Sequence, residues 1–176
     1  MTSARPPAPR WRCALAAALV LGAGAAGAVE PMEASVAERA GRLVATFDLG
    51  RALMAAGYPE AQAGFDTLGN VGGTVAAGDA TVTFVPAVHG SDVSGEAGSR
   101  PGGVPVGFVV RVKGGPTVYH TGDTDAFGDM KLVPERYGRV DVMLACIGGH
   151  FTMDPAGAAL AASLVRPGRI VPMHFG

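Results

Sequence analysis

Apolar residues alternate with polar ones in short runs from residue 74 onward, and glycines separate the runs. The segment 74–89, TVAAGDATVTFVPAVH, predicts a hairpin that turns at Ala77-Gly78-Asp79 and continues as a strand over 80–88. The segment 104–123, VPVGFVVRVKGGPTVYHTGD, predicts a second hairpin that turns at Gly114-Gly115. Two successive hairpins indicate an antiparallel sheet in this part of the chain.

The remainder of the chain mixes strands with helices. Residues 140–147, VDVMLACI, are almost continuously apolar, which predicts a strand buried on both faces. The segment DPAGAALAASLVRPG predicts a helix that Asp154 caps, that has Pro155 in its first position, and that ends before Gly168. A brief helix is expected over 131–137, and RIVPMHF predicts a closing strand.

The N-terminal half is less regular. We expect a short helix over 33–41, a strand over 43–47, and a helix that Asp48 caps and Gly57 ends. Helices alternating with strands predict an α/β fold. The glycine-rich segment 64–73 and the polar segment 91–103 are expected to be loops, and a loop as long as the second is often functional.

Composition narrows the class of protein. The chain has 176 residues, of which 48% are hydrophobic and 16% charged, so it can bury a core and is not a disordered sequence. Its 14 basic and 15 acidic residues nearly balance, so there is no basic surface for nucleic acid. The composition therefore argues against a nucleic acid partner.

The first 28 residues have the composition of a secretory signal. Three arginines without an acid precede an uncharged stretch from Cys13 to Val29, and Ala26-Gly27-Ala28 fits a cleavage site. Residues 29–33 would then be a short linker, and the protein is expected to be periplasmic or secreted. A membrane anchor is the alternative, but 17 residues rich in Ala and Gly are short for a stable span. If Met32 is the true start, the protein would be cytoplasmic.

All four histidines of the chain stand at or just beyond the end of an apolar strand. They are His89, His120, His150 and His174, and Asp123 follows the same strand as His120. The ends of neighbouring strands can converge on one edge of a sheet. Imidazole nitrogens and a carboxylate suit zinc, iron or manganese, and a bound cation lowers the pKa of a water ligand.

An ordinary structural role is the alternative for each histidine taken singly, because most histidines bind no metal. Thr121-Gly122-Asp123-Thr124-Asp125 can equally be a simple turn. His120 is the weakest candidate ligand. It can pack on the sheet, or it can orient Asp123 without binding the metal itself.

Four segments extend this picture to a known family. VPAVHGS, GGPTVYHTGDTDAFGDM, VDVMLACIGGHFTMDP and IVPMHFG resemble, in order and spacing, the metal-dependent hydrolase branch of the metallo-β-lactamase superfamily. The resemblance runs from about Ala34 to the end of the chain. It implies an αββα sandwich with metals at one edge of its two sheets.

The resemblance also implies roles for individual residues. His89 would be a terminal ligand of one metal, Asp123 the carboxylate that bridges two metals, and His174 a ligand of the second. His150 would line the substrate pocket as a proton donor or an oxyanion partner. The metals, zinc or alternatively manganese, would polarise an ester, lactone, amide or phosphodiester and supply the attacking hydroxide.

This sequence departs from the family in one respect. The superfamily carries a His-x-His-x-Asp-His motif upstream, whereas no histidine precedes His89 here. The family also continues past the segment IVPMHFG. We therefore expect residues 34–176 to be a truncated domain, an incomplete αββα sandwich that binds one metal ion weakly or none.

The truncation leaves three hypotheses for function. The chain is an impaired metal-dependent hydrolase, a catalytically inactive remnant, or a metal- or ligand-binding module without turnover. Loss of early strands would also expose a sheet edge, through which the chain could self-associate.

Overall fold

The computed structural model describes residues 43–55, 65–95 and 98–175. The expected signal segment 1–28, the linker 29–33 and the helix over 33–41 lie outside the described residues, as does the helix end at Gly57. The described elements, in chain order, are β1 (Ala45–Thr46), α2 (Phe47–Ala55), β2 (Leu68–Gly69), β3 (Thr74–Ala77), β4 (Ala80–Pro86), β5 (Asp92–Gly95), β6 (Gly98–Pro101), β7 (Val106–Val112), β8 (Thr117–His120), the 3₁₀ helix η3 (Gly128–Lys131), α3 (Leu132–Tyr137), β9 (Val142–Cys146), α4 (Pro155–Val165) and β10 (Arg169–Met173).

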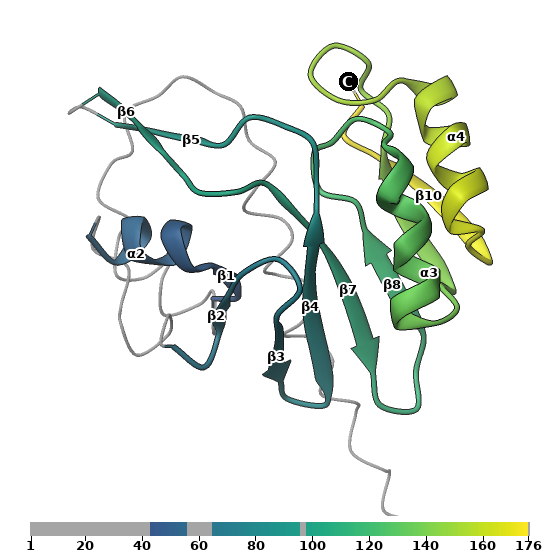
Figure 1. Ribbon diagram of the computed structural model, residues 1–176, viewed down its shortest axis with the longest axis horizontal. Helices are drawn as coiled ribbons and strands as arrows, with labels where there is room; N and C mark the ends of the chain where they lie inside the picture. Colours follow the sequence, from purple (N-terminus) through teal and green to yellow (C-terminus); the bar gives the residue numbers. More distant parts are fainter. Residues whose placement is uncertain (1–42, 56–64, 96–97, 176) are drawn as a thin grey trace, which may run out of the picture.

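A six-stranded sheet with the order β10-β9-β8-β7-β4-β3 forms the centre of the molecule (Figure 1). The hairpins β3–β4 and β7–β8 are antiparallel, as the sequence predicted, and β7 also pairs antiparallel with β4. Strands β8, β9 and β10 are parallel to one another. It follows that β4, β8, β9 and β10 all run in the same direction, so their C-terminal ends emerge at one edge of the sheet.

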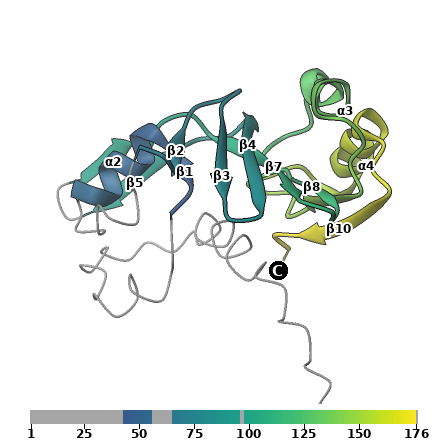
Figure 2. The same cartoon turned by 90° about the horizontal axis from the view of Figure 1, so that it is seen from below.

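Helices α3 and α4 cover one face of this sheet (Figure 2). Beneath them lies the larger core, in which Tyr119 and Met143 are fully buried. Helix α4 begins as predicted: Asp154 accepts a hydrogen bond from the Gly157 N–H at 2.7 Å, and Pro155 occupies the first turn. Among the described residues there is no helix with the length and apolarity needed to cross a bilayer.

The opposite face of the sheet is packed at only one end. On β4 and β7, Phe84 and Phe108 are buried with their ring centroids 5.5 Å apart. The same row of side chains continues across the sheet to Leu144 on β9 and Val171 on β10. Leu144 is half-buried and Val171 is 46% exposed. The prediction that β9 is buried on both faces is therefore wrong for this face.

The polar segment 91–103 contains two strands, so the prediction of a loop is wrong as well. β5 and β6 pair as an antiparallel hairpin, and the Gly102 N–H donates to the Ser91 carbonyl oxygen at its base, at 2.7 Å. Backbone hydrogen bonds hold such a pair together without an apolar face, which is why the hydrophobic pattern did not reveal it.

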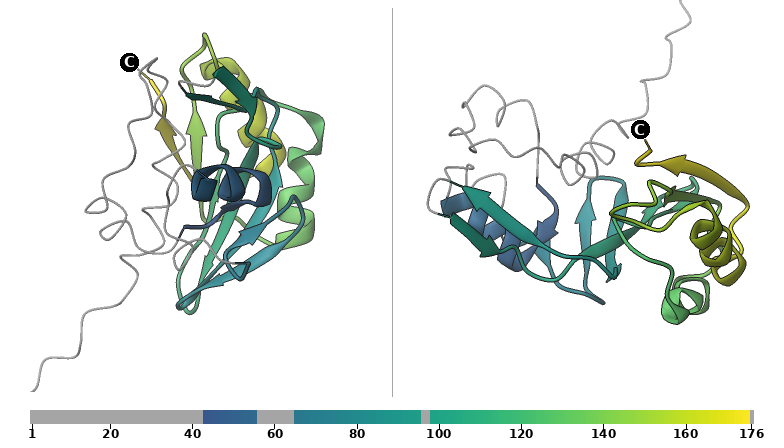
Figure 3. Two further views of the ribbon diagram at one scale, coloured as in Figure 1. Left: turned by 90° about the vertical axis from the view of Figure 1, so that its left-hand side faces the viewer. Right: turned by 90° about the horizontal axis from the view of Figure 1, so that it is seen from above.

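The expected strand over 43–47 is shorter than predicted. β1 has two residues, pairs in parallel with β2 inside the segment expected to be a loop, and is followed directly by α2, which starts at Phe47. The right-hand view of Figure 3 shows α2, in blue, at the end of the molecule away from α3 and α4. Leu43, Ala45 and Leu68 form a small core of their own beside α2.

Candidate metal centre

The shared edge of the sheet brings the candidate residues into one region. His89 follows β4, Asp123 follows β8, His150 follows β9 and His174 follows β10 directly. Because these four strands run in the same direction, loops far apart in the sequence leave the sheet side by side (Figure 1). The hydrophobic pattern and parallel packing together explain this placement.

Asp123 and His174 form the centre of the site. The His174 Nε2 atom lies 3.5 Å from the Asp123 Oδ2 atom, and both side chains are partly open to solvent, at 32% and 26% exposure. A carboxylate oxygen and an imidazole nitrogen are atom types that bind metals in proteins, and here they approach each other closely.

A close backbone approach holds His174 in place. A Cβ atom on Gly148 would lie 2.6 Å from the His174 carbonyl oxygen and 2.9 Å from its Nδ1 atom, so only glycine fits there without a shift. The Ile147 N–H also donates to the Met173 carbonyl oxygen at 3.0 Å. His174 itself has a φ of 53°, an uncommon value for a residue with a side chain. The end of β10 is thus held in a strained conformation that aims the ring at Asp123.

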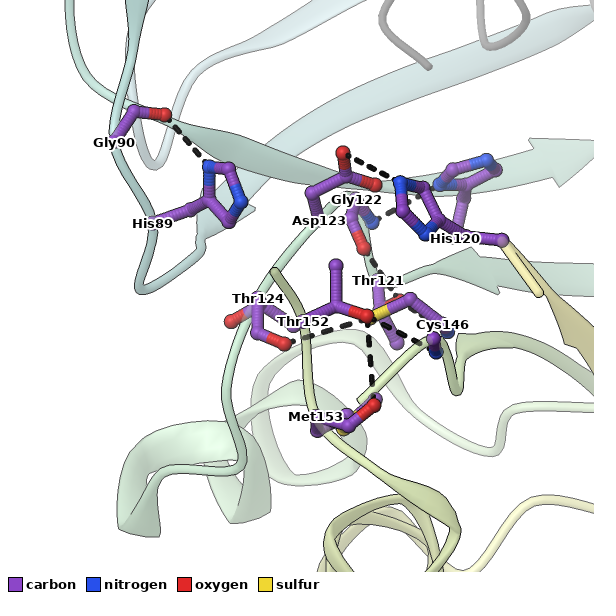
Figure 4. Close-up of polar contacts among 12 residues, drawn as sticks. His89, Gly90, His120, Thr121, Gly122, Asp123, Thr124, Cys146, Thr152 and Met153 are labelled. Atoms are coloured by element: carbon purple, nitrogen blue, oxygen red, sulfur yellow. Dashed lines mark hydrogen bonds and ion pairs between the residues drawn. The ribbon is translucent and has the colours of Figure 1, made fainter. Parts of the chain in front are cut away.

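His120 supports the turn that carries Asp123. Its Nδ1 atom accepts a hydrogen bond from the Gly122 N–H at 3.0 Å, which occupies that nitrogen (Figure 4). Burial lowers the pKa of His120, and the nearby Asp123 carboxylate opposes that shift only in part. Both observations favour a neutral imidazole that acts as an acceptor and braces the turn.

His89 and His150 are exposed and are not joined to the central pair by side-chain contacts. The His89 Nδ1 atom lies 2.8 Å from the Gly90 carbonyl oxygen, which leaves Nε2 uncommitted by this contact (Figure 4). The His150 ring meets the exposed Phe151 ring edge to face, with centroids 4.3 Å apart. Over the described ranges, no three His, Cys, Asp or Glu side chains are close enough to hold a metal ion.

The central pair nevertheless fits a metal as two of its ligands. Two atoms bound tetrahedrally to zinc at about 2.0–2.1 Å lie about 3.4 Å from each other. The observed 3.5 Å between Asp123 and His174 matches that separation. A catalytic zinc site takes three protein ligands, so His89 would have to turn from Gly90 to complete the set.

A buried polar network beneath the site was missed at the sequence level. Thr121 and Thr124 are fully buried, and both contact the Cys146 side chain or its backbone. The Thr121 hydroxyl lies 3.7 Å from the Cys146 Sγ atom, and the Cys146 thiol lies 3.4 Å from the Thr124 carbonyl oxygen. The segment TGDTD permits a simple turn as the alternative to a ligand role, but its pattern carries no signal that its threonines are buried.

Comparison with known proteins identifies the family of the chain. Residues 33–175 match the model of the β-lactamase superfamily domain. The chain belongs to this superfamily. It is 64% identical over 144 residues to a UPF0173 metal-dependent hydrolase of Anaeromyxobacter dehalogenans, covering 81% of this chain and 53% of that protein. A UPF0173 metal-dependent hydrolase of Thermodesulfovibrio yellowstonii is 50% identical over 147 residues, covering 79% and 54%.

The fold also has a solved counterpart. Igni18, a metallo hydrolase from the archaeon Ignicoccus hospitalis, superposes with a TM-score of 0.61 at 30% identity. The superposition covers 81% of this chain and 57% of Igni18. The resemblance expected from the four sequence segments is thereby confirmed. The chain spans about half the length of the relatives it matches.

Proposed function

We propose that this chain carries part of the active centre of a metal-dependent hydrolase that acts on a small ester, lactone, amide or phosphodiester. The approach of Asp123 Oδ2 to His174 Nε2, at 3.5 Å on the shared edge of the sheet, is the observation that supports this proposal. Zinc is the preferred metal, with manganese as the alternative, and one weakly bound ion is expected. Membership in a superfamily whose relatives are named metal-dependent hydrolases adds to the support.

The residues take different roles in this proposal. Asp123 and His174 hold the ion, and His89 joins them through its Nε2 atom after its ring turns away from Gly90. A bound cation supplies a polarised substrate oxygen and a water of lowered pKa. His150, on the exposed loop after β9, faces substrate and donates a proton or stabilises an oxyanion.

Metal titration of matched variants tests the ligand assignment. Asp123→Asn should abolish zinc binding, because an amide is a much poorer ligand than a carboxylate. Asp125→Asn is the control, since Asp125 lies two residues away, is exposed, and uses Oδ1 to accept the Ala126 N–H at 2.7 Å. Equal zinc affinity in the two variants would refute the role of Asp123. An activated ester, a lactone and a phosphodiester, each assayed with zinc, then test for turnover and substrate class.

A backbone variant tests the position of His174 without removing a ligand. In Gly148→Ala the new methyl group collides with the His174 carbonyl oxygen, so the end of β10 must move away. Zinc binding should weaken although Asp123, His174 and His89 are all present. Gly128→Ala serves as the control, because Gly128, like Gly148, has no positive φ, and its Cβ would meet nothing within 4 Å. Unchanged zinc affinity in Gly148→Ala would contradict the proposed arrangement.

Metal or ligand binding without turnover is the second candidate. The finding that favours it is that the described residues contain no group of three metal ligands. Zinc binding that depends on Asp123, together with no hydrolysis of any of the three substrate types, would favour this candidate over the hydrolase.

Two further proposals concern the state of the protein. Self-association through β10 is supported by its position at the sheet edge and by the exposed Ile170 and Val171. Sedimentation of the chain and of Ile170→Lys would detect it as a loss of the larger species in the variant.

Export to the periplasm or the medium rests on the signal-like residues 1–28, and N-terminal sequencing of the expressed protein would test cleavage after Ala28.

A further inference from the structure

We infer that Thr124 is a positioning residue that joins the segment carrying His89 to the turn carrying Asp123. The inference rests on the proposed function, since it assigns Thr124 a role in assembling that metal site. Thr124 touches neither the metal-binding atoms nor substrate in this arrangement. It acts through the two neighbouring segments of backbone.

Two hydrogen bonds link those segments reciprocally. The Val88 N–H donates to the Thr124 hydroxyl oxygen at 2.9 Å, and the Asp125 N–H donates to the Val88 carbonyl oxygen at 3.1 Å. Val88 immediately precedes His89, while Thr124 immediately follows Asp123. The pair of bonds therefore fixes the backbone of one candidate ligand relative to the backbone of the other, although 34 positions of sequence separate them.

A third segment meets at the same residue. The Met153 N–H donates to the Thr124 carbonyl oxygen at 2.9 Å, and the Cys146 thiol lies 3.4 Å from that oxygen (Figure 4). Met153 ends the loop after β9 that carries His150. Thr124 thus joins its own loop, which carries Asp123, to two others. These are the loop that carries His89 and the loop that carries His150.

The chemistry of threonine suits this role. Its hydroxyl accepts from Val88 and donates to the Asp125 carbonyl oxygen at 2.7 Å, and a hydroxyl can do both at once. Thr124 is fully buried, so water cannot replace these bonds. Valine has nearly the same shape but leaves the Val88 N–H without its acceptor. Serine keeps the hydroxyl and loses only a methyl group.

Amide hydrogen exchange of the metal-free chain tests the link directly. Thr124→Val should speed exchange at Val88 by about tenfold relative to the unmodified protein, because the N–H loses its buried acceptor. Thr124→Ser should restore slow exchange. Thr83→Val is the matched control: Thr83 is also buried, but its hydroxyl lies 2.8 Å from the Thr74 hydroxyl on β3. Equal exchange at Val88 in Thr124→Val and Thr83→Val would overturn the inference.

Zinc titration of the same variants tests the consequence for the site. Thr124→Val should weaken zinc binding about tenfold, the order of loss seen when residues supporting metal ligands are removed. Thr124→Ser and Thr83→Val should bind zinc like the unmodified chain. Unchanged zinc affinity in Thr124→Val would overturn the positioning role even if the exchange result holds.

The two measurements separate failure of this inference from failure of the proposed function. If the unmodified chain binds no zinc, the proposed metal site is wrong and Thr124 positions no ligand. Exchange at Val88 would still establish whether Thr124 joins the two segments. If the unmodified chain binds zinc and Thr124→Val binds it as tightly as Thr83→Val does, the metal site stands and the positioning role of Thr124 is wrong.

Discussion

The two faces of strand β9 are covered very differently. Under α4, Met143 and Ala145 on β9 are fully buried, whereas Val142 and Leu144, which alternate with them, are only half-buried. Val171 on β10 continues the open face and is 46% exposed. On β9, equally apolar residues thus differ in burial, because burial depends on whether a second layer packs against that face. On the edge strand β10 both faces are open, since Ile170, which pairs with Met143, is 49% exposed.

The candidate metal centre combines residues from well-packed and sparsely packed regions. Asp123 follows β8, which has a neighbouring strand on each side, while His174 follows β10 at the sheet edge. Local opening occurs most easily where few apolar contacts are buried. We therefore expect the His174 side of the site to move more than the Asp123 side.

Truncation of Met143 should have the largest effect of the variants that probe this difference. Met143 is fully buried in the helix-covered core, so Met143→Ala removes buried methylene groups and leaves a cavity. The free energy of unfolding should fall by about 3 kcal/mol. Urea denaturation measures the change, and a loss below about 1 kcal/mol would show that this face is as loosely packed as the other.

The pH dependence of the free energy of unfolding tests the covered face a second time, through Tyr119. Its hydroxyl is buried and has no hydrogen-bond partner among the residues that the structure describes, and burial, reinforced by the nearby Cys146, raises its pKa. The folded chain keeps this proton at a pH where the unfolded chain, with a pKa near 10, loses it. Stability should therefore be intact below pH 10 and fall above it, by about 1.4 kcal/mol per pH unit.

Tyr119→Phe should remove that decline, and it should not reduce stability at pH 7 because it removes an unpaired buried hydroxyl. Tyr137→Phe on α3 is the control, as Tyr137 is only half-buried. Unfolding curves between pH 8 and 11 compare the three proteins. Equal slopes above pH 10 in all three would mean that Tyr119 reaches solvent or a partner.

The strand pattern could be predicted where side chains determine it. The turns at Gly78 and Gly114 and the cap at Asp154 were found because glycine with positive φ and a carboxylate before proline have local causes. The hairpin β5–β6 was missed because backbone pairing between polar residues leaves no periodic signal. The half-open face of β9 was also missed, since a strand's own sequence does not show what covers it.

The site was predictable to a similar extent. Strand ends bearing histidine and aspartate could be read from the sequence, and the common direction of β4, β8, β9 and β10 explains why they meet at one edge. The contacts that orient the side chains could not be read. Gly148 accommodates His174, and Thr124 bonds to Val88, only because the tertiary structure brings distant segments together.

The cap of α4 tests how firmly the covering layer is attached. Asp154→Ala removes the side chain that accepts the Gly157 N–H, leaving the first turn of the helix without that bond. Stability should fall by about 1 kcal/mol. Asp154→Asn is the control, because asparagine caps helices about as well. Chemical denaturation measures both, and equal losses in the two variants would indicate that the negative charge, not the hydrogen bond, matters.

A threonine scan of valines on the two faces gives the smallest expected effect and the sharpest comparison. Val171→Thr keeps the shape and the β-propensity of a side chain that is already 46% exposed, so stability should change by no more than about 0.5 kcal/mol. Val109→Thr places the same hydroxyl on β7 beneath the helices, where it should cost about 1–3 kcal/mol. A large loss in Val171→Thr would mean that this face is covered in solution, by another copy of the chain or by a further segment. Sedimentation of the variant at two concentrations would distinguish these, because only association between copies depends on concentration.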